Sequence, residues 1–358
     1  MPDSGSFRAL RFRAGPTARR LIQENGFSAG QIGSIAGASG GAKWLVLSQL
    51  DRVIARRILP RLTEPVHLIG TSIGAWRFTC YAQQEPVAAI DRFEEAYLEQ
   101  RYSKNPDIHE ISAKSREILE WVLGTQGIEE ILTHPVLRMH VMTVRARSIA
   151  ASEHRVLLGL ALIIAAMANT VSRRTLGALF SRSLFYDPRT PPPFFDLAGM
   201  PIERTPMNAA NLLPSVLATG AIPLVLSGVR DITGAPSGMY RDGGIIDYHL
   251  DFPASAEGRI TLYPHFYDHL IPGWFDKRLK WRRPAPASID RTLLLCPSDE
   301  FVARLPNRKI PDRRDFSTMS PDRRRKVWRE VVVACEALAD ELNEALDSGD
   351  LASRLEPL

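Results

Sequence analysis

The segment VHLIGTSIGAWRFTCYA (66–82) decides the fold class of this 358-residue chain. It starts with apolar residues typical of a buried strand, turns at a glycine-rich stretch, and continues with residues that favour a helix. The segment QIGSIAGASGGAKWLVLSQL (31–50) repeats this order of strand, tight turn and helix. Two such units in succession predict parallel βα units, and therefore an α/β fold.

Periodicity and turn residues predict the remaining elements. The tail 320–349 reads as one long amphipathic helix, with Ser320 as its N-cap and Pro321 at its first position. The proline-rich stretch 169–207 is predicted to be a loop-rich excursion. Further helices are expected at 16–26, 42–59, 86–102, 111–124 and 210–223, and further strands at 136–147, 259–266 and 291–298.

The composition is that of an ordinary globular protein, with 45% hydrophobic and 24% charged residues. The three cysteines, Cys80, Cys296 and Cys335, are far apart and odd in number, which disfavours a disulfide framework or a cysteine metal site. No apolar run follows the charged N-terminal residues, so a secretory signal is not expected. We therefore predict a cytoplasmic protein and leave peripheral contact with a membrane open. We expect no cofactor.

The most apolar stretch is VLLGLALIIAAMA (156–168). It is shorter than the ~20 residues that a bilayer-spanning helix needs. A buried core helix is the first interpretation. An interfacial or substrate-covering segment is the alternative, because Arg155 precedes the stretch and Arg173 and Arg174 follow it.

The formal net charge of +5 is modest, but basic residues cluster at 274–284, 304–316 and 322–330. A solvated face is the default interpretation of such clusters, and contact with an anionic membrane surface is an alternative. Trp274, Phe275 and Trp281 stand among the cations of the first cluster, a composition typical of a lipid interface. No nucleic-acid-binding signature is present, so no nucleic-acid partner is expected.

Two segments, GASGG (37–41) and GTSIG (70–74), match the G-x-S-x-G pattern of a nucleophile elbow. Such an elbow places a serine on the sharp turn between a strand and a helix, where flanking glycines prevent collisions with the backbone. Ser72, between Gly70 and Gly74, follows the strand-like VHLI and precedes a helix. Ser39 lies in a similar junction, so the position of the turn does not separate the two serines.

The chemistry of the first loop does separate them. GASGGAK (37–43) has three glycines just before a helix, so its backbone amides and the helix dipole favour an anion. In acyl transfer that anion is the oxyanion of the tetrahedral intermediate. We therefore expect Ser72 to attack and the amides of Gly40, Gly41 and Ala42 to stabilise the charge. Ser39 is expected to shape this oxyanion hole.

The segment YRDGGIIDYH (240–249) offers a base. Gly243 and Gly244 follow Asp242, which allows a tight bend and the close approach of another loop. An aspartate in water has a pKa of about 3.9, but burial beside a serine would make it a better base. A Ser–His–acid triad that uses His249 or His265 is the alternative, although no motif surrounds either histidine.

The three motifs, in this order, resemble those of the patatin-like phospholipases. GGAK (40–43) is similar to the family's oxyanion motif, GTSIG to its elbow and DGGIID (242–247) to its aspartate motif, with ATGAIP (218–223) shortly before the last. The resemblance implies Ser72 as nucleophile, Asp242 as general base and Lys43 at the family's basic position. It also implies a three-layer α/β/α fold with a mainly parallel sheet, and metal-free hydrolysis of lipid esters.

The resemblance covers residues 30–250, which we predict to be the catalytic core. Residues 1–29 are then an N-terminal extension, and residues 251–358 a C-terminal extension without a family motif. Ser39 and Trp44 stand where the family usually has glycine, and Tyr248 stands where it often has asparagine. An acyltransferase or a non-catalytic lipid-binding protein on the same fold are the remaining alternatives.

Overall fold

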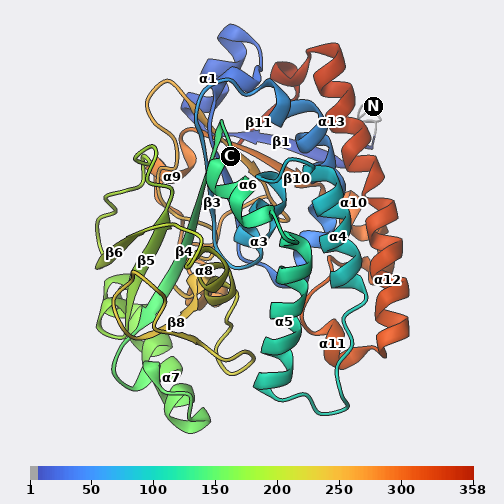
Figure 1. Cartoon of the computed structure of the whole chain (residues 1–358). Coiled ribbons are helices and arrows are strands. Elements are labelled where there is room, and N and C mark those ends of the chain that lie inside the picture. The colour runs from blue at the N-terminus through green and yellow to red at the C-terminus, as the bar shows by residue number, and fades with distance from the viewer. Residues whose placement is uncertain (1–6) are drawn as a thin grey trace.

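The computed structural model describes residues 7–358, so the first six residues of the predicted N-terminal extension lie outside it. Its centre is an 11-stranded sheet in the order β11-β1-β10-β9-β2-β3-β4-β5-β6, with β8 also paired to β4 and β7 to β8 (Figure 1). The strands are β1 Leu10–Ala14, β2 Ile32–Gly37, β3 Val66–Gly70, β4 Leu137–Ala146, β5 Phe180–Tyr186, β6 Ile202–Pro206, β7 Val229–Arg230, β8 Met239–Asp242, β9 Ile260–Pro264, β10 Thr292–Pro297 and β11 Leu355–Pro357.

The middle of the sheet is parallel. β10, β9, β2, β3 and β4 pair with one another in the parallel sense. β1 joins β10 antiparallel, and β5 and β8 both join β4 antiparallel. From β2 the chain moves to β3 on one side, and it returns much later with β9 on the other. The carboxyl end of β2 is therefore a topological switch point, where open α/β sheets bind their ligands.

Helices cover one face of the sheet, on the right in Figure 1. This layer holds α2 Ser48–Val53, α3 Ile73–Tyr81, α4 Pro86–Leu98, α5 Ile108–Leu123, α6 Gly127–Thr133, α12 Pro321–Ala334 and α13 Glu336–Ser348. Phe194 packs against His67 of β3 and His140 of β4. The remaining helices are α1 Pro16–Asn25, α7 Arg155–Val171, α8 Leu212–Thr219, α9 Pro286–Ile289, α10 Asp299–Arg304 and α11 Asp315–Thr318. The predicted α/β class with a mainly parallel central sheet is confirmed.

Two helix predictions need correction. The predicted helix at 42–59 begins as a 3₁₀-helix (Gly41–Leu47), becomes α2, and continues as a π-helical turn (Ile54–Ile58). The predicted single helix at 320–349 is two helices that meet at Cys335, with Ser320 capping the first through the amide of Arg323. The break lets α12 follow α4 while α13 packs against α2, so each half buries its own apolar face.

The loop-rich prediction for 169–207 was wrong in part, because this stretch contains β5 and β6. Polar residues such as Arg182 and Ser183 interrupt the hydrophobic pattern of β5, although tertiary partners bury them in the structure. The pattern also gave no sign of β1, which pairs with β10. Strands from 1–29, 30–250 and 251–358 belong to one sheet, and the division into these three segments stays a sequence-based prediction.

The apolar stretch at 156–168 forms most of α7, but the buried-core interpretation was wrong for one side of this helix. Leu158, Ala161, Leu162 and Ala165 are buried, whereas seven large apolar side chains of α7 are exposed. In residues 7–358, no helix combines the length and the apolar character needed to cross a bilayer.

A buried ion pair joins α3 to α2. Both side chains are almost fully buried, and the Arg77 guanidinium donates to both carboxylate oxygens of Asp51, at 2.8 and 2.5 Å. The hydroxyl of Tyr81 donates to the same carboxylate at 2.7 Å. Although desolvation opposes it, the carboxylate raises the pKa of Arg77, so the guanidinium stays charged. This network anchors the helix that begins directly after Ser72.

We expect Asp51→Ala to lower the free energy of unfolding by about 3–5 kcal/mol, because it leaves a buried guanidinium without a counter-ion. Asp347→Ala is the matched control, because it breaks the ion pair with Arg57 at a largely exposed carboxylate. That change should cost less than about 1 kcal/mol. Urea unfolding measures the free energy of unfolding of both variants. If Asp51→Ala lowers it as little as Asp347→Ala does, the buried ion pair does not stabilise the protein more than an exposed one.

Candidate active site

Ser72 lies on a strained turn between β3 and α3. Its φ of 51° and ψ of −129° belong to a region that non-glycine residues rarely adopt. A Cβ at Gly74 would stand 2.0 Å from the carbonyl oxygen of Gly37, and a Cβ at Gly70 would stand 2.4 Å from the amide nitrogen of Ala75. Both glycines of the GTSIG motif are therefore required by close backbone contacts.

Thr219, the last residue of α8, holds this turn. Its Oγ1 accepts a hydrogen bond from the Ser72 amide at 2.9 Å and donates one to the carbonyl oxygen of Met142 at 2.5 Å. The sequence pointed to the segment 218–223 but not to this role. A threonine before a glycine at the end of a helix has no distinctive pattern, so only the structure reveals it.

Asp242 ends β8, which pairs with β4 so that Asp242 lies opposite Thr143. The Ser72 hydroxyl donates to Asp242 Oδ2 at 2.8 Å, and the Gly244 amide donates to Oδ1 at 2.7 Å. A Cβ at Gly243 would stand 2.1 Å from the carbonyl oxygen of Met142. The glycines of the DGG motif thus let the loop pack closely enough to join the two side chains.

The environment of Asp242 makes its carboxylate more basic than a solvated one. Burial raises the pKa of Asp242 to about 6, while the hydrogen bonds from Gly244 and Ser72 and the charge of Lys277 lower it. Near neutral pH the carboxylate is thus ionised, yet it accepts a proton more readily than an exposed aspartate.

Ser39 has a different environment. Its hydroxyl donates to Thr71 Oγ1 at 3.0 Å, and that hydroxyl donates to the carbonyl oxygen of Asp247 at 3.0 Å. The Ser39 amide donates to the carbonyl oxygen of Tyr248 at 2.9 Å. These bonds tie the glycine loop to the elbow and to the DGGIID loop, which suits a structural role rather than an attacking one.

The glycine loop then turns towards Ser72. Gly41 has a φ of +55°, and a Cβ at Gly40 would stand 2.5 Å from the Phe266 ring. Gly41 and Ala42 begin the 3₁₀-helix, and amides in a first helical turn have no partner within the helix. Gly40, Gly41 and Ala42 line the same cavity as Ser72, so their loop can present amides to a ligand there.

That cavity has a volume of about 810 Å³, within the range of small-molecule sites. Its lining combines apolar and cationic side chains. The apolar residues include Ile73, Trp76, Ile111, Ile118, Ile222, Val225, Leu226 and Ile245. The charged residues are the cations Lys43, Lys104, Lys277, Arg313, Arg314 and Arg324 and the carboxylates Asp242 and Asp312.

Lys277 was not among the predicted site residues. Its ammonium lies 3.8 Å from the centre of the Tyr248 ring, and the residue lines the cavity together with Asp242. Burial of the ammonium and the nearby charge of Lys43 lower the pKa of Lys277 to about 7, although the side chain as a whole is exposed. Burial also lowers the pKa of Lys43. The sequence did not mark Lys277 as a site residue, because it belongs to a basic cluster and such clusters usually face solvent.

The histidines of the alternative triad are not at Ser72. The Nδ1 atom of His249 accepts from the Ile271 amide, and that of His265 accepts from the Tyr267 amide. Burial holds the pKa of His249 well below its usual range and lowers that of His265 to about 3. Within residues 7–358, no three His, Cys, Asp or Glu side chains are grouped closely enough to hold a metal ion.

The DGGIID loop is held by a second buried ion pair. Arg182 of β5 donates to both carboxylate oxygens of Asp247 at 2.7 Å, and both side chains are buried. Because Asp247 also provides the carbonyl that Thr71 bonds, this pair helps to fix the distance between the loop and the elbow.

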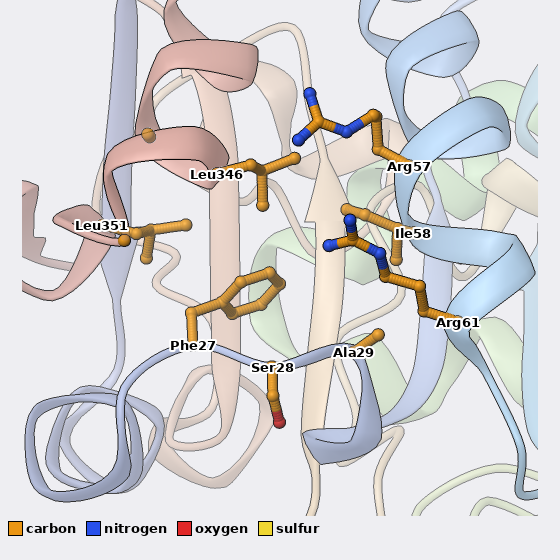
Figure 2. Close-up of a pocket in the computed structure, with 10 residues that line it drawn as sticks. Phe27, Ser28, Ala29, Arg57, Ile58, Arg61, Leu346 and Leu351 are labelled. Carbon is orange, nitrogen blue, oxygen red and sulfur yellow. The ribbon is translucent and has the colours of Figure 1, made fainter.

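A second pocket, of only about 70 Å³, shares no lining residue with this cavity (Figure 2). Figure 2 shows the guanidinium groups of Arg57 and Arg61 on the same side as Ile58, facing Phe27 and Leu346. Its lining has no carboxylate, histidine or cysteine side chain. The pocket is also too small for an acyl chain, so the cavity at Ser72 is the candidate active site.

No protein-family model matches the chain, and no curated protein matches it. Among solved structures, the crystal structure of VipD from Legionella pneumophila is similar, with a TM-score of 0.34 and 13% sequence identity over 75% of this chain. The match covers 56% of that protein, so this chain spans about half of its length. A likeness of this size carries no argument about family or activity.

We expect Thr219→Val to lower the free energy of unfolding by about 1–3 kcal/mol, because it leaves the Ser72 amide and the Met142 carbonyl without a partner. Thr219→Ser keeps the hydroxyl and should lose much less. Thermal and urea unfolding compare the two variants. Val keeps the γ-methyl group and removes only the hydroxyl, so a Thr219→Val variant as stable as the wild-type protein would show that the two hydrogen bonds do not stabilise the turn.

Proposed function

We propose that this protein is a serine acyl hydrolase of the patatin-like type, which cleaves carboxylic esters of lipids. The observation that carries the proposal is the 2.8 Å hydrogen bond from Ser72 to a buried carboxylate, at the wall of a large cavity. The motif resemblance to patatin-like phospholipases agrees with it.

In the proposed reaction, Ser72 Oγ attacks the ester carbonyl carbon while Asp242 Oδ2 takes the hydroxyl proton. The C–O bond to the alcohol then breaks, and Asp242 returns the proton to the leaving oxygen. Water, deprotonated by Asp242, attacks the acyl-enzyme, and the fatty acid leaves as Ser72 regains its proton. The raised pKa of Asp242 supports its role in both proton transfers.

The glycine loop is the proposed oxyanion hole. The amides of Gly40, Gly41 and Ala42 would donate to the oxygen that becomes negative when Ser72 attacks. The lowered pKa of Lys43 reflects burial, and its nearby charge would add to the positive potential. Ser39 supports the loop by its bond to Thr71 and takes no part in attack.

The mixed lining of the cavity favours an amphiphilic substrate with negative charge. Its apolar side chains suit an acyl chain, whereas its cations suit a phosphate or carboxylate group. The six cations outnumber the two carboxylates in the lining, which argues against a cationic substrate. A triad with His249 or His265 has less support, because both Nδ1 atoms accept backbone hydrogen bonds elsewhere.

Ser72→Ala and Asp242→Asn should each reduce hydrolysis of a p-nitrophenyl acyl ester by at least about 10²-fold, because each removes a reacting group. Circular dichroism should show that both variants remain folded. Labelling by a fluorophosphonate probe should be lost in Ser72→Ala.

Ser39→Ala and His265→Gln are the controls, and both should keep most of the activity. Full activity in Ser72→Ala would refute the proposed nucleophile. Loss of activity in the folded His265→Gln variant would instead support the triad.

The activity should depend on pH through Asp242. The protonated acid cannot accept a proton, so kcat/KM should fall about tenfold per pH unit below pH 6 and level off above it. The charge of Lys277 lowers the pKa of Asp242, so Lys277→Met should move the midpoint to higher pH. A midpoint near pH 4 in the wild-type protein would contradict a buried base.

A further inference from the structure

Helix α7 bears the main exposed apolar surface of residues 7–358. Seven of the twelve large hydrophobic side chains exposed there belong to this one helix, and Val171 is 83% exposed. The seven are Val156, Leu157, Leu160, Ile163, Ile164, Met167 and Val171. The other five are scattered over different elements. Such a concentration on one helix marks an interaction surface.

The exposed residues form a continuous stripe. At the ~100° turn per residue of an α-helix, their positions fall within an arc of about 120°. The opposite side of the helix, with Leu158 and Leu162, packs into a hydrophobic cluster that includes Ile245 and Ile246. α7 is therefore anchored to the loop that follows Asp242, and the helix lies at the lower left edge of the molecule in Figure 1.

Cations lie at both ends of this stripe. α7 itself contains no acidic residue, and Arg155 and Arg174 at its ends are exposed. Arg282 donates to the carbonyl oxygen of Asn169 at 2.7 Å, which ties the segment 278–283 to the end of the helix. In that segment Arg278, Lys280, Trp281 and Arg283 are exposed, and Trp281 is 67% exposed.

We propose that α7 and the segment 278–283 form a docking surface for an anionic lipid bilayer. An apolar stripe with cations beside it matches the acyl boundary and the charged headgroups of such a membrane. None of the three exposed cations in 278–283 forms an ion pair with a residue in 7–358, so all three are available for headgroups. Trp281 adds an aromatic side chain suited to the interface.

Charge favours a membrane over a second copy of this chain. An antiparallel pairing of two α7 helices would bring Arg155 of one copy towards Arg174 of the other. Because no acidic residue of α7 offsets these charges, self-association would be opposed by repulsion. An anionic bilayer meets the same charges favourably.

The docking surface lies beside the cavity. Trp274 and Lys277, just before 278–283, line the cavity, and Ile245 both lines it and belongs to the cluster beneath α7. A bilayer held there would be next to the site where we propose ester cleavage. The docking itself does not depend on that proposed chemistry.

Co-sedimentation with vesicles tests the proposal. The full chain with Ser72→Ala, which keeps the lipids intact, is mixed with vesicles of phosphatidylcholine alone or with about one third phosphatidylserine. We expect binding to the phosphatidylserine vesicles that weakens as salt is added. Ile163→Gln with Met167→Gln should lower the partition coefficient at least about tenfold. Lys280→Gln with Arg283→Gln should lower it roughly tenfold, on the anionic vesicles only.

The matched controls are on α12, where Val333→Gln replaces an exposed apolar residue and Arg323→Gln with Lys326→Gln removes two exposed cations. They should leave binding unchanged. The proposal is overturned if the parent protein binds neither vesicle, or if the α7 variant binds as well as the parent. It is also overturned if sedimentation velocity shows a dimer that the α7 variant dissociates, because the occupant is then a second copy.

Discussion

The first turn of α3 lies against the end of β2, with no room for a side chain between them. The carbonyl oxygen of Gly37 occupies the place of a Cβ at Gly74, so the two βα units meet backbone to backbone. The Thr71 amide donates to the same carbonyl at 3.1 Å. This contact sets the elbow beside the glycine loop, and the rest of the site is arranged around it.

Holding Ser72 in a strained conformation requires support from several sides. Thr219 bonds its amide, Asp242 accepts from its hydroxyl, and the Asp51–Arg77 pair anchors the helix that follows. Each polar group is buried and has a partner, which limits the cost of removing it from water. Such a rigid framework suits a site in which the donors must be in place before charge develops.

The cavity and α7 are linked through one loop. Asp242 begins the loop, Ile245 lies at the cavity wall, and Ile246 packs beneath α7. The cavity has both charged and apolar side chains, and it lies beside an apolar helix with cations at its ends. This arrangement is consistent with a protein that takes lipid from a membrane. The proposed ester hydrolysis and the proposed membrane docking are independent, so either can fail without the other.

Glycine spacing and hydrophobic periodicity can be read within short segments of the chain. The sequence was therefore sufficient to predict the α/β class and the positions of the two strand–turn–helix units. It also predicted Ser72 and Asp242 as partners, and the structure brings those two side chains within hydrogen-bond distance. Only the tertiary structure decided the role of Thr219, the place of Lys277 in the cavity wall and the exposed side of α7. Each of these depends on contacts between segments far apart in the chain, which no local pattern encodes. The break at Cys335 and the strand β5 were missed for the same reason, because distant partners bury the residues concerned.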